Sequence, residues 1–276
     1  MPNFVAMGRT GIWMVLLLIV ALSKAGNAQL VLYDNFNSKQ IDPAKWVGAA
    51  TSLASDANRR EVAVQLVGEE NRHLRISETI YSPNTENTGS SGDGFGIGFA
   101  SPEKVTAVSF TLAVNKDAVS GCTANPFGWA GAGYFGRYFR PDANNGLIGD
   151  IAASIGVGRL SVDPPGSLSV GASIVRCNDN TPSCDDQSTL SSQTLGSVQL
   201  GSNNTFSVTW DRDNHQFIFQ LNNEAPVPLA YAMSDTFPAG LPEKDFFVTG
   251  NVPHCTTNPR PSASIDALLD NVYVNR

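Results

Sequence analysis

The residue best suited to acid–base chemistry is Asp150, in the stretch GLIGDIAASIGVGR from Gly146 to Arg159. Alternation along this stretch predicts a strand that turns Asp150, Ala152 and Ser154 to one face. Retaining cleavage of a glycosidic bond needs two carboxyl groups roughly 5–5.5 Å apart, and residues i and i+2 of a strand supply that separation. Ala152 and Ser154 follow Asp150 on this face, so the strand offers one carboxylate where the chemistry needs two.

Aromatic and basic residues gather between positions 127 and 140, and they form the best candidate for a ligand platform. The cluster consists of Phe127, Trp129, Tyr134, Phe135, Arg137, Tyr138, Phe139 and Arg140. Aromatic rings stack on the C–H faces of sugars, and arginine donates hydrogen bonds to hydroxyl groups. Alternation puts the two tyrosines on one face and Phe135 and Phe139 on the other, so one pair is expected in the core. The residues expected to contact a ligand are Trp129, Tyr134, Arg137, Tyr138 and Asp150.

The first 28 residues have the layout of a secretory signal peptide. Arg9 supplies a positive charge, Gly11–Leu22 is apolar, and the small residues of Gly26–Ala28 precede Gln29. The apolar run is shorter than the roughly 20 residues that a membrane span needs, so cleavage near Ala28 is expected, with an uncleaved anchor as the alternative. We therefore expect a secreted protein, extracellular or periplasmic, in which residues 29–276 form one domain.

The charge of the chain argues against two classes of partner. The formal net charge is −7, and removal of Arg9 and Lys24 with the signal peptide would make it −9. No cluster of lysine and arginine interrupts this acidic balance. We therefore expect no nucleic-acid partner and no membrane association beyond export.

Four cysteines, an even number, suggest disulfide bonds in an exported protein, with three possible pairings. Cys177 and Cys184 bracket a polar, turn-rich loop that could close locally, which would leave Cys122 for Cys255. The latter two begin the similar pentapeptides CTANP and CTTNP, so we expect both at turn-like strand ends. Zinc is the alternative, but the chain has no Cys-x-x-Cys motif, and His254 beside Cys255 is its only close His–Cys pair.

Short apolar–polar alternations recur along the chain with turn signals between them. Val105–Val114 alternates in this way, and Thr205–Trp210 and Gln216–Leu221 flank a polar turn and predict a hairpin. Other expected strands are Leu30–Phe36, Glu61–Val67, His73–Ser77, Phe95–Phe99, Gly131–Phe139, Leu168–Cys177, Phe246–Val252 and Ile265–Val274. No segment has a long helical pattern. We expect an all-β fold, an antiparallel β-sandwich of the jelly-roll kind.

Three segments resemble the concanavalin A-like lectin/glucanase superfamily. They are the opening LYDNFNSKQIDPAKW, the hairpin FSVTWDRDNHQFIFQLNN and the closing ASIDALLDNVYVNR. The resemblance implies a concanavalin A-like jelly roll and a carbohydrate ligand. Laminarinase/lichenase-type members carry Glu-x-Asp-x-x-Glu on a mid-chain strand, and only one acid, Asp150, matches that pattern here.

The same resemblance implies one structural calcium ion. Asp270, in LLDNVYV, matches a position where relatives of this fold bind Ca²⁺, and Asp34 is a plausible neighbour because first and last strands often pair. Calcium takes six to eight oxygen ligands, which one aspartate cannot provide. The alternative is that Asp270 pins a strand edge.

These observations favour a secreted protein that binds a carbohydrate or another surface ligand without cleaving it. One alternative is a glycoside hydrolase or polysaccharide lyase with an unusual site. Arg59–Val62 (RREV) faintly resembles the alginate-lyase group, but the other two motifs of that group are absent. A second alternative is a structural or adhesive extracellular protein. None of His73, His215 and His254 has a clear acid–base setting in the sequence.

Overall fold

The computed structural model describes residues 29–49, 58–69, 71–83, 86–143, 146–181, 184 and 186–275, without the side chains of residues 49 and 58–61. The predicted signal peptide lies outside these ranges, as do the side chains of Arg59 to Glu61 in the lyase-like segment. No helix in the described part of the chain is long and apolar enough to cross a membrane.

The described strands form two antiparallel sheets. In the first, the order is β13 (Val227–Ala230), β12 (Gln216–Leu221), β11 (Asn204–Asp211), β6 (Ala107–Val119), β16 (Ser262–Asn275), β4 (His73–Tyr81) and β3 (Asn58–Val67), and β1 (Leu30–Asp34) also pairs with β16. In the second, the order is β10 (Gln187–Gln199), β9 (Ser167–Cys177), β8 (Ile151–Leu160), β7 (Trp129–Arg140), β15 (Lys244–Pro253), β5 (Ser90–Phe99) and β2 (Trp46–Ala49), and β14 (Phe237–Pro238) also pairs with β7. One 3₁₀ turn covers Pro102–Lys104.

The core lies between the two sheets, where alternate apolar side chains of each sheet meet. Phe110 of β6 contacts Tyr134 of β7 and Phe246 of β15 with ring centroids 6.2 and 4.9 Å apart. Burial of such rings is the main favourable contribution to the stability of a sandwich this size. The predicted antiparallel β-sandwich is confirmed.

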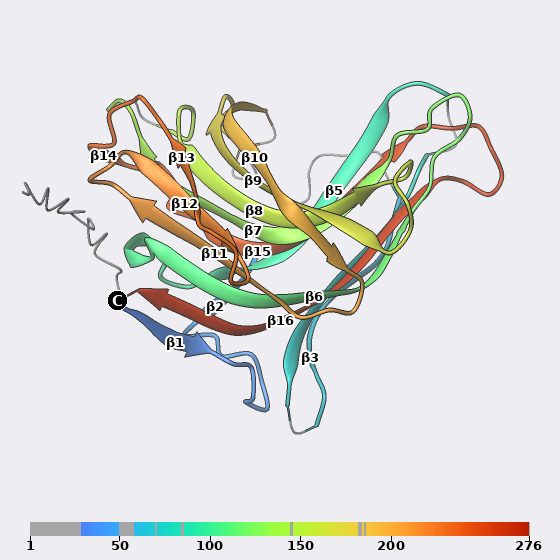
Figure 1. Ribbon diagram of the computed structural model, residues 1–276. Helices are drawn as coiled ribbons and strands as arrows, with labels where there is room; N and C mark the ends of the chain where they lie inside the picture. The colour runs from blue at the N-terminus through green and yellow to red at the C-terminus, as the bar shows by residue number, and fades with distance from the viewer. Residues whose placement is uncertain are drawn as a thin grey trace, which may run out of the picture.

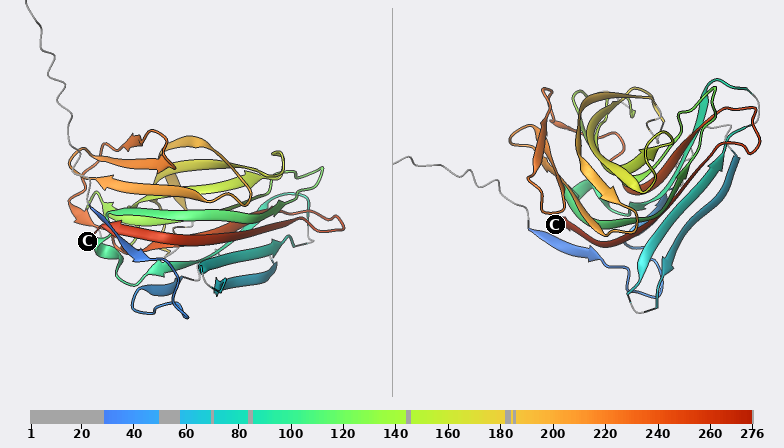
Figure 2. Two further views of the ribbon diagram at one scale, coloured as in Figure 1. Left: turned by 60° about the horizontal axis from the view of Figure 1, so that its bottom comes forward. Right: turned by 45° about the vertical axis from the view of Figure 1, so that its right-hand side comes forward.

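Both sheets bow in the same direction, so the outer face of the second sheet is concave (Figure 1). Strands β9 and β10 curl around this hollow side (Figure 2, right). The concave face is formed by the residues of β7, β8, β9 and β15 that point away from the core.

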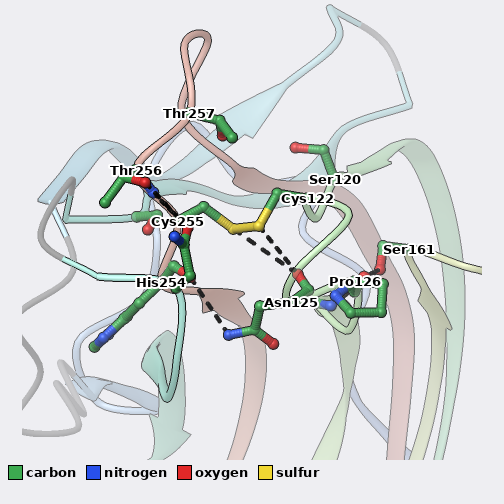
Figure 3. The surroundings of a disulfide bond; sticks show 12 residues. Ser120, Cys122, Asn125, Pro126, Ser161, His254, Cys255, Thr256 and Thr257 are labelled. Atoms are coloured by element: carbon green, nitrogen blue, oxygen red, sulfur yellow. Dashed lines mark hydrogen bonds between the residues drawn. A yellow bond between two sulfur atoms is a disulfide. The ribbon is translucent and has the colours of Figure 1, made fainter.

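The two disulfide bonds are Cys122–Cys255 and Cys177–Cys184. The first connects the segment after β6 to the segment after β15 and so joins the two sheets (Figure 3). The second closes the short loop after β9. Because Cys255 is bonded to Cys122, it has no thiolate for the zinc site that the sequence left open.

Candidate functional site

The concave face is lined mostly by residues with small side chains. Cross-strand partners share a face, so Gly131 of β7 and Gly158 of β8 lie side by side, as do Gly156 of β8 and Gly171 of β9. Along these strands the concave positions with small side chains are Gly131, Gly133, Ser154, Gly156, Gly158, Ser169, Gly171 and Ser173, and Phe135 is a large residue on the same face. This composition leaves backbone and hydroxyl groups accessible at the floor of the hollow.

Close approach of neighbouring strands explains two of these glycines. A Cβ atom on Gly133 would lie 2.4 Å from the carbonyl oxygen of Ile155, and one on Gly158 would lie 2.7 Å from that of Ala130. Such contacts are too short for a side chain. A Cβ atom on Gly171, in contrast, would meet no atom within 4 Å. Gly171 therefore leaves open space in the hollow that a larger side chain would fill.

A groove of about 350 Å³ runs over this floor. Its walls are formed by Trp129, Leu160, Asp163 and Phe247, and its floor by Gly131, Ser154, Gly156, Gly158, Ser169 and Gly171. A groove of this volume can hold a small ligand of a few rings or a short stretch of an extended oligomer.

Trp129 forms an aromatic platform at one end of the groove. A Cβ atom on Gly131 would lie 2.4 Å from Cζ3 of the indole, so the ring rests directly on the backbone of Gly131. The indole is 38% exposed, which leaves surface for a ligand. Phe127, Leu160 and Val162 are also exposed.

The charged groups that line the groove are paired with other groups of the protein. Arg159 forms a salt bridge with Asp117 and donates hydrogen bonds to the carbonyl oxygens of Leu160 and Asp163, both at 3.2 Å. The carboxylate of Asp163 accepts a hydrogen bond of 3.0 Å from the backbone N–H of Leu160. Both charged groups are therefore engaged by other groups of the protein.

The two tyrosines that the sequence assigned to ligand contact lie in the core instead. Their hydroxyl groups are 2.9 Å apart, and burial raises the pKa of both Tyr134 and Tyr138. The register of β7 against β8 shifts between Arg137 and Phe139, which is the signature of a β-bulge. The two tyrosines share the core face and Phe135 lies on the opposite face, as alternation predicts. The bulge breaks the alternation after Arg137, so Phe139 is also buried in the core, and its predicted placement beside Phe135 is wrong.

Arg137 and Asp150 are also inaccessible to a ligand. Both side chains are fully buried, and Nη1 of Arg137 lies 3.8 Å from Oδ2 of Asp150. The Asp150 carboxylate accepts hydrogen bonds from the backbone N–H groups of Gly240 at 2.7 Å and Leu241 at 3.2 Å. Asp150 therefore fixes a loop and does not face the groove, so of the five expected contact residues Trp129 alone lines it.

A pair of acids that the sequence analysis missed lies close to Arg137. Glu243 directly precedes β15, and Asp245, two residues later, pairs with Phe135 and points to the outer face of the sheet. Burial raises the pKa of Asp245 to about 8, with a further contribution from the charge of Glu243, and burial also raises the pKa of Glu243. The sequence signal is Glu243-Lys244-Asp245, just before the predicted strand Phe246–Val252, which lacks the third acid of Glu-x-Asp-x-x-Glu.

The loop closed by Cys177–Cys184 lies next to this charged cluster. Nη2 of Arg137 donates a hydrogen bond of 3.4 Å to the carbonyl oxygen of Thr181. Desolvation opposes ionisation of Asp179, but hydrogen bonds from Asp186 and Thr181, with a smaller contribution from the positive charge of Arg137, lower the pKa of Asp179. Arg137 therefore connects the sheet to this loop.

The two aspartates expected to bind calcium come from paired strands. Asp34 pairs with Val272 across β1 and β16, two residues from Asp270. Oδ2 of Asp34 accepts a hydrogen bond of 2.8 Å from the indole of Trp46, and Oδ2 of Asp270 lies 3.3 Å from Nδ1 of His73. No group of three or more metal-ligating side chains occurs in the described part of the chain. Both carboxylates are engaged by the protein, and neither belongs to a group of side chains in the described residues that could supply the six to eight oxygen ligands of calcium.

A scan against protein-family models finds no match, and neither does a search of curated proteins. Among solved structures, the carbohydrate recognition domain of Emp46p in its potassium-bound form is similar over 87% of this chain and 96% of its own, with 12% identity and a TM-score of 0.40. LamAcat from Zobellia galactanivorans is similar over 88% of this chain and 96% of its own, with 12% identity and a TM-score of 0.45. Laminarinase from Flavobacterium sp. UMI-01 is similar over 90% of this chain and 100% of its own, with 11% identity and a TM-score of 0.44.

Proposed function

We propose that this protein is secreted and binds a carbohydrate chain in the groove on its concave face, without cleaving it. The observation that carries the proposal is the platform of Trp129, which rests on Gly131 and remains 38% exposed at the end of a groove floored by small residues. A flat aromatic ring beside accessible hydroxyl and backbone groups suits a ligand that is apolar on its ring faces and polar on its edges.

The paired state of Arg159 and Asp163 supports a ligand bound by stacking and neutral hydrogen bonds. The hydroxyl groups of Ser154 and Ser169 can each donate and accept hydrogen bonds along the floor of the groove. The three segments that resemble lectin/glucanase domains support carbohydrate over other chemistries. Secretion, signal cleavage near Ala28 and a single domain over residues 29–276 form part of the proposal, and two disulfide bonds support an oxidising compartment.

The groove assignment is tested by filling the groove without straining the fold. Gly171→Phe introduces a ring where a Cβ atom meets no atom within 4 Å, and Gly48→Phe on β2 is a matched control because its Cβ position is also open. Retention on a panel of insoluble and soluble polysaccharides should fall at least tenfold for Gly171→Phe and for Trp129→Ala, and stay unchanged for Gly48→Phe. Equal retention of all three variants would exclude the groove as the binding site.

Cleavage is the second candidate, and the observation that favours it is the acid pair Glu243 and Asp245. A carboxyl group whose pKa is raised to about 8 is protonated at neutral pH and is a candidate proton donor. Asp245 is buried, however, and it does not line the groove. Release of reducing ends or unsaturated products from the panel, abolished by Asp245→Asn, would establish an enzyme in place of a binding protein.

A further inference from the structure

A serine, a histidine and a glutamate form a hydrogen-bonded chain beside the disulfide bond Cys122–Cys255. Oγ of Ser91 lies 2.6 Å from Nε2 of His254, and Nδ1 of the same ring lies 2.8 Å from Oε1 of Glu86. No acid–base setting for His254 is visible in the sequence because its partners are 163 and 168 residues away along the polypeptide.

Several elements hold the imidazole in place. The backbone N–H of His254 donates a hydrogen bond of 3.1 Å to the carbonyl oxygen of Gly89, in the turn between Glu86 and β5. Asn125 donates to the same carbonyl oxygen at 2.7 Å and to that of His254 at 3.4 Å (Figure 3). The next residue, Cys255, is covalently tied to Cys122. The ring is therefore anchored by the turn, by Asn125 and by the disulfide.

The hydrogen-bonding capacity of the three side chains determines which atom donates and which accepts in each hydrogen bond. A carboxylate accepts hydrogen bonds and does not donate them, so the Nδ1 hydrogen of His254 is directed at Glu86. The Nε2 atom of this tautomer is an acceptor, and the hydroxyl of Ser91 donates to it. A serine nucleophile is activated when its hydroxyl is hydrogen-bonded to a base and a third group orients that base.

We propose that Ser91 is a nucleophile for small acyl esters, with His254 as general base and Glu86 as the positioning residue for His254. Ser91 is only 4% exposed, so the acyl group that reaches it must be small, of about the size of acetyl. The side chain of Glu86 is 54% exposed, so the carboxylate lies at the surface and Ser91 at the buried end of the hydrogen-bonded series. This proposal is independent of the groove, because none of the three residues lines it.

The chemistry is acyl transfer to water. Ser91 Oγ bonds to the ester carbonyl carbon while its proton passes to Nε2 of His254. The bond from the carbonyl carbon to the alcohol oxygen then breaks, and the alcohol leaves with that proton. Water next attacks the acyl-serine, gives up a proton to His254, and releases the carboxylic acid, after which His254 returns the proton to Ser91.

The test uses the full chain with its disulfides intact, p-nitrophenyl acetate as substrate and phenylmethylsulfonyl fluoride as covalent probe. Peptide mass mapping should find one acyl or sulfonyl group on Ser91. Ser91→Ala should abolish both the adduct and the ester hydrolysis above background. The matched control is Ser82→Ala, since Ser82 is equally buried but donates to the carbonyl oxygen of Pro83, and it should keep full reactivity.

Glu86→Gln tests the positioning role without disturbing the fold, because the side chain of Glu86 is half exposed and the substitution keeps its size. It should lower the rate of Ser91 modification about tenfold or more while the circular dichroism spectrum stays that of the parent protein. An absence of any adduct on Ser91 in the folded protein would overturn the proposal. So would a modification rate that Glu86→Gln leaves unchanged, and this second result is informative even if Ser91→Ala does not fold.

Discussion

Lys244 and Asp245 are consecutive residues of β15 that are buried on opposite sides of the same sheet. Nζ of Lys244 donates to the carbonyl oxygens of Pro102 and Arg137, both at 3.0 Å, and lies 4.7 Å from the ring centre of Tyr138 in the core. Asp245 points to the other face, near Arg137. Burial lowers the pKa of Lys244 to about 8 and raises that of Asp245 to about 8.

The raised pKa of Asp245 predicts a loss of stability as pH rises. The unfolded chain releases the proton near its ordinary pKa of 3.8, while the folded protein holds it up to about 8. The free energy of unfolding of the parent protein should therefore fall, relative to Asp245→Asn, between about pH 4 and pH 8, by a few kcal/mol in all. Urea unfolding of both proteins across this range measures the difference, and parallel curves would contradict the prediction.

The lowered pKa of Lys244 predicts the opposite trend in an alkaline window. The unfolded chain takes up the proton near pH 10.5 and the folded protein only near pH 8, so stability rises with pH between these values. Relative to Lys244→Met, the free energy of unfolding should increase by about 1.4 kcal/mol per pH unit from pH 8 to 10. A constant difference between the two proteins in this window would show that the ammonium group is solvated.

Replacement of Gly131 should displace the indole of Trp129. In Gly131→Val the new Cβ atom would lie 2.4 Å from Cζ3 of the ring, which must move off the strand. We expect polysaccharide retention to fall about as far as in Trp129→Ala, with altered tryptophan fluorescence and roughly 1 kcal/mol or less lost in stability. Gly48→Val, at a position with open space, is the control. Unchanged retention in Gly131→Val would show that the ring position is irrelevant to binding.

The two disulfide bonds should differ in their contribution to stability. Cys122 and Cys255 are separated by 133 residues, and Cys177 and Cys184 by 7. In the chain-entropy model the long loop contributes about 5 kcal/mol and the short one about 2.5 kcal/mol, both as upper values. Thermal unfolding of the paired Cys→Ser variants should rank in that order. A larger loss from removing Cys177–Cys184 would mean that its loop has a stabilising role beyond the covalent bond.

The contacts of Asp34 and Asp270 predict that calcium does not stabilise the fold through these residues. Trp46 and His73 already engage the two carboxylates. We expect the Tm to be the same with excess EDTA and with millimolar Ca²⁺. A rise in Tm with Ca²⁺ that disappears in Asp270→Asn would contradict this expectation and restore the calcium site that the resemblance implies.

Alternation of side chains determined most of the sandwich from the sequence alone. Strands such as β11 and β12 are buried on one face, and that burial imposes a period of two that can be read along the chain. The sequence pattern does not predict strand β10, because this strand lies at a sheet edge and nearly all its residues are exposed, so no alternation of buried residues marks it. Exposed strands are held by the backbone pairing of their neighbour, which leaves little trace in side-chain composition.

The sites depended on tertiary structure for two physical reasons. A one-residue bulge near Tyr138 reverses the facing of every later side chain on β7, and no simple alternation reveals it. The concave groove and the Ser91–His254–Glu86 chain each join residues from separate strands, whose proximity follows from sheet order. The sequence determined which residues lie in strands and that the strands form a sandwich. Only the curvature of the sheets and the pairing of distant strands decided which side chains meet.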